Sequence, residues 1–110
     1  MRYPVRLNQE IKVPIYVSNS LYKQYLINVA VGGMTDRRKD LLSVVEVEKL
    51  VVKKVNQVDI FKCLSTENIA RYLALKILRL NREGIHEVAV TVYEAENSCA
   101  TVVVQNPEID

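Results

Sequence analysis

The sequence is poor in the residues that build metal and redox sites. Its 110 residues include one histidine, two cysteines and no tryptophan. His86 alone cannot supply a histidine metal site within one chain, and Cys63 and Cys99 make neither a disulfide framework nor a CxxC pair. We therefore expect two buried or partly buried free thiols, no metal site and no cofactor.

Long hydrophobic runs and a strong charge of one sign are also missing. No apolar run approaches the roughly 18 to 20 residues of a membrane span, and no hydrophobic block follows Met1. The net charge of +2 is small, and the densest basic run, Asp36–Asp40, is bracketed by acidic residues, which is typical of a solvated loop. We expect a cytoplasmic protein that binds neither membrane nor nucleic acid.

The remaining composition is that of one globular domain covering residues 1–110. Hydrophobic residues make up 49% and charged residues 25%, and no linker or internal repeat divides the chain. Asn8–Val17 is rich in β-branched residues, although Pro14 favours an edge position or a bulge. Gln24–Gly32 alternates as a strand does, which predicts an antiparallel pair joined by Ser18–Lys23. The side chains expected on one face of that second strand are Tyr25, Ile27, Val29 and Val31.

Two helices are expected in the middle of the chain. Ser43 and Glu46 have the spacing of a capping box, so the valine-rich segment that follows is predicted to be helical. Its apolar residues at helical spacing are Val47, Leu50, Val51, Val55 and Val58. The second helix follows Cys63, with Gly84 as its expected stop. Its apolar stripe consists of Ile69, Leu73, Ile77 and Leu80.

Two further strands, His86–Glu94 and Cys99–Gln105, close the chain. The order ββααββ predicts an α+β fold in which a four-stranded antiparallel sheet carries both helices on one face. The other face and both sheet edges stay open, which favours association of identical subunits.

The second helix begins with four polar residues, Ser65 to Asn68. Serine or threonine at an N-cap accepts a backbone N–H, and an acidic residue in the first turn meets the positive end of the helix dipole. These roles explain the residue types. The same residues also suit a ligand site, and the sequence leaves both roles open.

The element order, Ser65–Leu78 (STENIARYLALKIL) and Val90–Ala100 (VTVYEAENSCA) together resemble the 6-pyruvoyl-tetrahydropterin synthase family, which includes 6-carboxytetrahydropterin synthases. The resemblance covers Gln24 to Ala100. It implies the tunnelling fold, in which subunits join their sheets into a barrel and bind pterins or purines between neighbours. A homo-oligomer, possibly a hexamer, and a pterin or purine-like small molecule are the implied partners.

The resemblance also implies which residues bind the ligand. A pterin presents an N–H beside an amino group, and a carboxylate accepts both through its two oxygens. The matching carboxylate is Glu94, and the residues that would flank the ligand are Ser65, Thr66 and Glu67.

The family's zinc site has no counterpart in this sequence. Two zinc histidines of the family would align with Leu21 and Lys23, and its catalytic cysteine would align near Val17. None of these side chains is a zinc ligand, and a charged lysine repels the ion. The family's Asp–His pair is matched by Asp59 and Ile60, so the lyase mechanism is not supported.

Two alternatives stay open. Dihydroneopterin aldolases share the fold and use a catalytic lysine where this chain has Glu94, so that interpretation lacks its proton carrier. A non-enzymatic scaffold with a vestigial pocket is the other. The interpretation we favour is a pterin- or purine-binding protein of this fold without the family's zinc-dependent chemistry.

Overall fold

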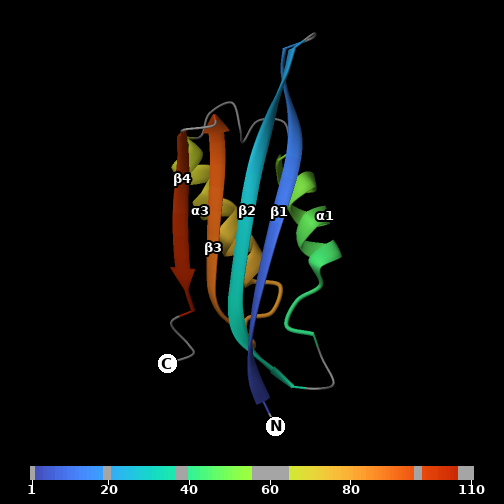
Figure 1. Cartoon of the computed structure of the whole chain (residues 1–110), viewed down its shortest axis with the longest axis vertical. Helices are drawn as coiled ribbons and strands as arrows, with labels where there is room; N and C mark the ends of the chain where they lie inside the picture. The colour runs from blue at the N-terminus through green and yellow to red at the C-terminus, as the bar shows by residue number, and fades with distance from the viewer. Residues whose placement is uncertain (1, 19–20, 37–39, 56–64, 96–97, 107–110) are drawn as a thin grey trace.

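The computed structural model describes residues 2–18, 21–36, 40–55, 65–95 and 98–106, and only the backbone of 14–18, 21–24 and 94–95. Four antiparallel strands form one sheet in the order β1-β2-β3-β4, and two helices lie between the second and third strands in sequence (Figure 1). The elements are β1 (Arg2–Ser18), β2 (Leu21–Asp36), α1 (Val44–Val55), α3 (Thr66–Leu78), β3 (Ile85–Ala95) and β4 (Ser98–Gln105). The predicted α+β subunit, with the order ββααββ and one four-stranded antiparallel sheet, is confirmed.

One hydrophobic core joins both helices to one face of the sheet. α3 packs on β3 and β4, and α1 packs on β1. The inward side chains follow the alternation expected from the sequence, since every second residue of a strand points to the same face. The buried residues include Ile27, Val29 and Val31 of β2, Val88, Val90 and Val92 of β3, Val47, Val51 and Val55 of α1, and Ile69, Leu73 and Ile77 of α3.

The valine-rich segment is a helix, as its capping box predicts. The backbone N–H of Glu46 donates to Ser43 Oγ at 3.4 Å, which satisfies one of the free donors of the first turn. Three valines then follow at intervals of four and face the core, and Leu50 packs beside them. Spacing therefore outweighs the strand preference of valine. Val58, expected on the same stripe, lies outside the described residues.

Two details of the second helix differ from expectation. The helix ends at Leu78, six residues before Gly84, and Leu80 lies after it and is exposed. No glycine is needed at this end because the N–H groups of Arg79 and Leu80 already bond to carbonyls of the last turn. Gly84 instead lies against Gly33 on β2. A Cβ added to Gly33 would overlap the carbonyl oxygen of Gly84.

The polar link between α3 and β3 is held by asparagines. Asn81 donates from Nδ2 to the carbonyl of Leu41 at 2.9 Å and accepts the N–H of Gly84 at 3.1 Å. Asn106, buried after β4, donates to the carbonyl oxygens of Arg82 and Ile85. These bonds tie the end of α3 to the start of β3 and the end of β4.

Two predictions about the strands are wrong. β2 begins at Leu21, with Lys23 already paired to Ile15, so the expected Ser18–Lys23 connection is largely strand. Cys99 is exposed, whereas a buried or partly buried thiol was expected. Alternation along β4 turns Ala100, Val102 and Val104 inward and leaves Cys99 on the open face. Cys63 lies outside the described residues.

Within the described part of the chain, neither helix has the length and apolar character needed to cross a membrane.

Two of the leucines of α3, Leu73 and Leu75, provide a direct test of this packing. Leu73 is completely buried, while Leu75 in the same helix is 40% exposed. Leu73→Ala should lower the free energy of unfolding by about 2 to 5 kcal/mol, because it removes buried contacts and leaves a cavity. Leu75→Ala, the matched control, should cost less than about 1 kcal/mol. Urea denaturation measures both, and equal losses would contradict the assigned helix face.

Candidate ligand-binding site

Ser65 is the N-cap of α3. Its backbone is extended, with φ −68° and ψ 160°, and its Oγ accepts the backbone N–H of Asn68 at 3.3 Å. Its carbonyl accepts the first helical bond, from Ile69, at 3.0 Å. The predicted capping role is confirmed, and the hydroxyl can still donate its own hydrogen while it accepts.

The next two residues form the exposed first turn of the helix. Glu67 is exposed and forms an ion pair with Arg71 one turn later, at 3.2 Å between Arg71 Nη2 and Glu67 Oε1. Exposed pairs of this spacing contribute only about 0.3 to 0.5 kcal/mol, so a ligand can compete for the carboxylate at small cost. Thr66 is half-buried between Ser65 and Glu67.

Glu94 lies on an irregularity of β3 that the sequence did not reveal. Tyr93 pairs with Cys99 and Ala95 pairs with Ser98, so one residue of β3, Glu94, has no opposite residue on β4. Such a β-bulge changes the direction in which the strand presents its side chains, and bulges are enriched beside active sites. In the sequence, the only sign of this bulge is the short connection between β3 and β4.

The start of α3 and the bulge of β3 lie at the same end of the molecule (Figure 1). The bonds of Asn81 and Asn106 place the end of α3 beside the start of β3. Because α3 packs along β3 and β4, its first turn lies toward the end of β3 and the start of β4. The fold thus brings Ser65, Thr66 and Glu67 to the end that carries the backbone of Glu94.

A separate hollow of about 370 Å³ lies on the open face of the sheet. Small residues form its floor, among them Ala30 and Ala89. Its polar lining includes Asn8, Glu10, Asn28 and Thr91. The sequence alone does not reveal this hollow, although the alternation that assigns the inward valines also places these residues on the opposite face.

Comparison with solved structures identifies the architecture. A Plasmodium vivax 6-pyruvoyltetrahydropterin synthase with a mutated catalytic residue matches with a TM-score of 0.61 and 12% identity, over 96% of this chain and 99% of that one. The Caenorhabditis elegans 6-pyruvoyl tetrahydropterin synthase matches with a TM-score of 0.57 and 18% identity, over 93% and 95%. The Plasmodium falciparum synthase matches with 0.57 and 14%, over 94% and 98%. This chain has the fold of the 6-pyruvoyltetrahydropterin synthases. No family model and no curated protein matches its sequence.

The zinc site that the synthase resemblance implies does not fit this chain. Leu21 and Lys23 lie on β2 near its start, where the resemblance requires histidines. On β3, His86 lies between Ile85 and Glu87, which pair with Gly33 and Gly32 of β2. These two glycines are nine and ten residues beyond Lys23 along β2. At roughly 3.3 Å per residue this is about 30 Å away, too far to complete the same site. Asp59 and Ile60 lie outside the described residues, and the described ones contain no metal-binding group of three His, Cys, Asp or Glu.

The donor set therefore predicts that purified protein carries no stoichiometric zinc. Elemental analysis after dialysis should find well under one zinc per chain, because Leu21 offers no lone pair and Lys23 carries a like charge. Zinc that survives dialysis at one per chain would show that other residues form a metal site.

The cap of α3 is tested by replacing Ser65. Ser65→Ala removes the acceptor for the Asn68 N–H and should lower the free energy of unfolding by about 0.5 to 2 kcal/mol. Ser65→Asn restores a side-chain oxygen and should stay close to the parent in urea denaturation. A loss as large in the asparagine variant would assign Ser65 a role other than capping.

Proposed function

We propose that the protein binds a pterin or purine-like heterocycle at the end of the molecule where α3 begins and β3 ends. The site lies at the boundary between copies of a cytoplasmic homo-oligomer, for which the resemblance implies a hexamer. The zinc-dependent lyase chemistry of the synthases is not part of this function. The observation that carries the proposal is the bulge at Glu94, at the end of the molecule that also carries the first turn of α3.

Glu94 supplies the chemistry of recognition. A carboxylate accepts two parallel hydrogen bonds from a donor pair, and the ring N–H and amino group of pterins and guanine form such a pair. Hydrogen bonds to a charged acceptor contribute more than neutral ones, about 1.5 to 3 kcal/mol. A bulge beside a hairpin is a position from which a strand presents a side chain away from its regular ladder.

The first turn of α3 provides complementary groups. The N-terminal end of a helix carries partial positive charge, so it attracts the carbonyl oxygen of a heterocycle. Ser65 and Glu67 are exposed there, and Thr66 lies between them. A ligand held by Glu94 would meet donors and acceptors of this turn on its flank.

Binding without conversion follows from the side chains that are missing. The positions of the zinc ligands carry leucine and lysine, and the lysine position of the aldolases carries Glu94 itself. Leucine and lysine are not zinc ligands, and Glu94 takes the place of the lysine that the aldolase interpretation requires as its proton carrier. The function supported best is therefore recognition of the heterocycle.

Calorimetric titration with neopterin, guanine and a 7-deazaguanine tests the proposal. Glu94→Gln replaces an acceptor with a donor that opposes the donors of the ligand. Affinity should fall about ten- to more than a hundredfold, which corresponds to roughly 1.5 to 3 kcal/mol. Glu87→Gln is the matched control, because Glu87 is an exposed glutamate near the opposite end of β3, and it should bind like the parent.

Two outcomes would contradict the proposal. Failure of the parent protein to bind any of the three compounds would favour a scaffold with a vestigial pocket. Equal binding by the parent and Glu94→Gln would show that Glu94 does not contact the ligand. Matching thermal unfolding curves for the variants confirm that a lost affinity does not reflect a lost fold.

A further inference from the structure

The hollow on the open face of the sheet is not used by the proposed function. Its volume of about 370 Å³ lies within the range of roughly 300 to 1,000 Å³ that is usual for ligand pockets. The residues of β3 that line it are Ala89 and Thr91, three to five residues before Glu94. At about 3.3 Å per residue, the hollow lies roughly 10 to 16 Å from the bulge along the strand. It is therefore a surface separate from the heterocycle site.

Two neighbouring rows of side chains cross the open face at this hollow. The polar row contains one residue of each strand: Glu10, Asn28, Thr91 and Thr101. The apolar row begins with Asn8 on β1 and continues with Ala30, Ala89 and Val103. Residues directly opposite on paired strands have Cβ atoms about 4.5 to 5.5 Å apart, so the members of a row can contact the same small molecule. The alanines leave the room between the larger side chains around them.

The oxygen atoms of the polar row can accept further hydrogen bonds. Among the residues that the structure describes, the side chains of Glu10 and Asn28 have no hydrogen-bond or ion-pair partner. Thr91 Oγ1 and Thr101 Oγ1 share one hydrogen bond of 2.7 Å, and a hydroxyl oxygen in such a pair keeps a lone pair for another donor. A carboxylate, a carboxamide and a hydroxyl therefore stand side by side on β1, β2 and β3.

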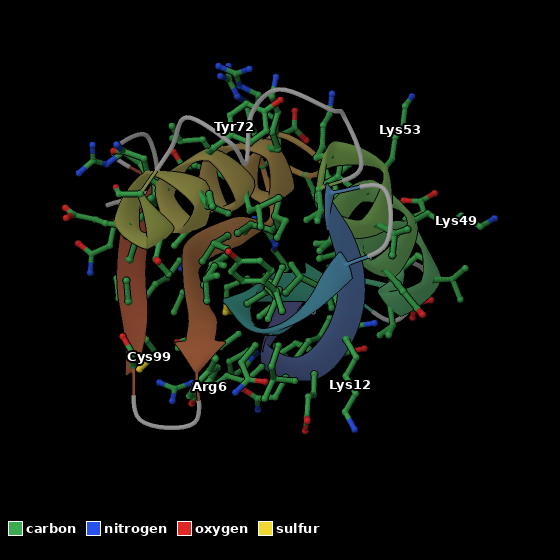
Figure 2. The ribbon with its side chains drawn as sticks, turned by 90° about the horizontal axis from the view of Figure 1, so that it is seen from above. Arg6, Lys12, Lys49, Lys53, Tyr72 and Cys99 are labelled. Carbon is green, nitrogen blue, oxygen red and sulfur yellow. The ribbon has the colours of Figure 1, made fainter. Side chains whose placement is uncertain are left out.

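The charge inside the hollow is negative. Of the described residues that line it, only Glu10 is ionisable. Two exposed cations flank it on β1, and Figure 2 shows Arg6 and Lys12 on the side of the sheet opposite the helices and well apart from each other. Glu87 lies in the same row as Arg6 and offsets its charge. Lys12, two residues from Glu10, is thus the cation that most weakens the attraction of the hollow for positive ligands.

We propose that the hollow binds an aliphatic primary amine in its protonated form, with the ammonium on the polar row and the alkyl chain on the apolar row. An ammonium has three N–H donors and no acceptor, which suits one carboxylate and two neutral oxygens. The alkyl chain would cover the two alanines and reach Val103, whose side chain is 52% exposed. A calcium ion fits less well, because it requires six to eight oxygen ligands and the lining supplies one carboxylate.

NMR of the alanine methyl groups measures binding at the hollow directly. Titration with n-butylamine at neutral pH should shift the signals of Ala30 and Ala89, which form the floor. Ala70 and Ala74 are completely buried in α3 and should not shift, so they are internal controls. Unchanged signals of Ala30 and Ala89 at millimolar n-butylamine would overturn the proposal.

Two analogues separate the contributions of charge and of hydrogen bonds. n-Butanol has no charge, and N,N,N-trimethylbutylammonium keeps the charge but has no N–H donor. Each should bind at least about tenfold more weakly than n-butylamine, because charge-assisted hydrogen bonds need both features. Equal binding of either analogue would overturn the assigned contacts. A response to calcium chloride without a response to n-butylamine would identify a metal site instead.

Three single variants test the assigned groups, and all three replace exposed residues. Glu10→Gln should weaken n-butylamine binding at least about tenfold, because it removes the charge that faces the ammonium. Glu87→Gln, the matched control on the same face, should bind like the parent. Lys12→Gln should tighten binding about two- to threefold, since it removes the nearest like charge. Equal binding by the parent and Glu10→Gln would overturn the proposal, and circular dichroism confirms that each variant is folded.

This inference and the proposed function can fail separately. Glu94→Gln should bind n-butylamine like the parent, and Glu10→Gln should bind the heterocycle like the parent. Loss of both ligands in either variant, with the fold intact, would show one shared site and overturn the assignment of a second one. Failure of the parent to bind any heterocycle leaves the n-butylamine titration as a complete test of the hollow.

Discussion

The packing of the apolar stripe of α3 against the inward valines of β3 is the contact on which the rest of the molecule depends. Leu73 and Ile77 are completely buried there, as are Val88 and Val90 across from them. The stripe fixes which side of the helix faces the sheet, and the asparagine bonds at its end fix the direction in which it runs. As a consequence, the first turn of α3 lies at the end of the sheet where β3 reaches Glu94.

That packing uses only one face of the sheet. Both helices contribute to a single core, so among the residues that the structure describes no helix or strand covers the opposite face or the outer sides of the two edge strands. The open face has small residues at its centre and polar ones around them, and its two margins differ in charge and proline content. Open sheet edges can pair with further strands, and prolines and charges, which hinder such pairing, lie on β1 and not on β4.

Likeness to the synthases extends to the fold and stops at the zinc ligands. Matches over nearly the whole chain at identities between 12% and 18% show that the same architecture is reached with different side chains. A fold fixes where functional groups are presented, while the chemistry depends on which groups are there. The resemblance places Leu21 and Lys23 where it requires zinc ligands, and it places Glu94 where it requires the carboxylate that binds the heterocycle.

The sequence by itself determined the order of the elements, the inward faces and the helix caps. These depend on local spacing: valines at every second residue, apolar residues every three to four, and Ser43 and Ser65 ahead of their first turns. It did not determine the exposure of Cys99, the bulge at Glu94 or the exact ends of β2 and α3. Those features depend on which residues of distant strands pair and on which face the helices occupy, so only the tertiary structure decided them.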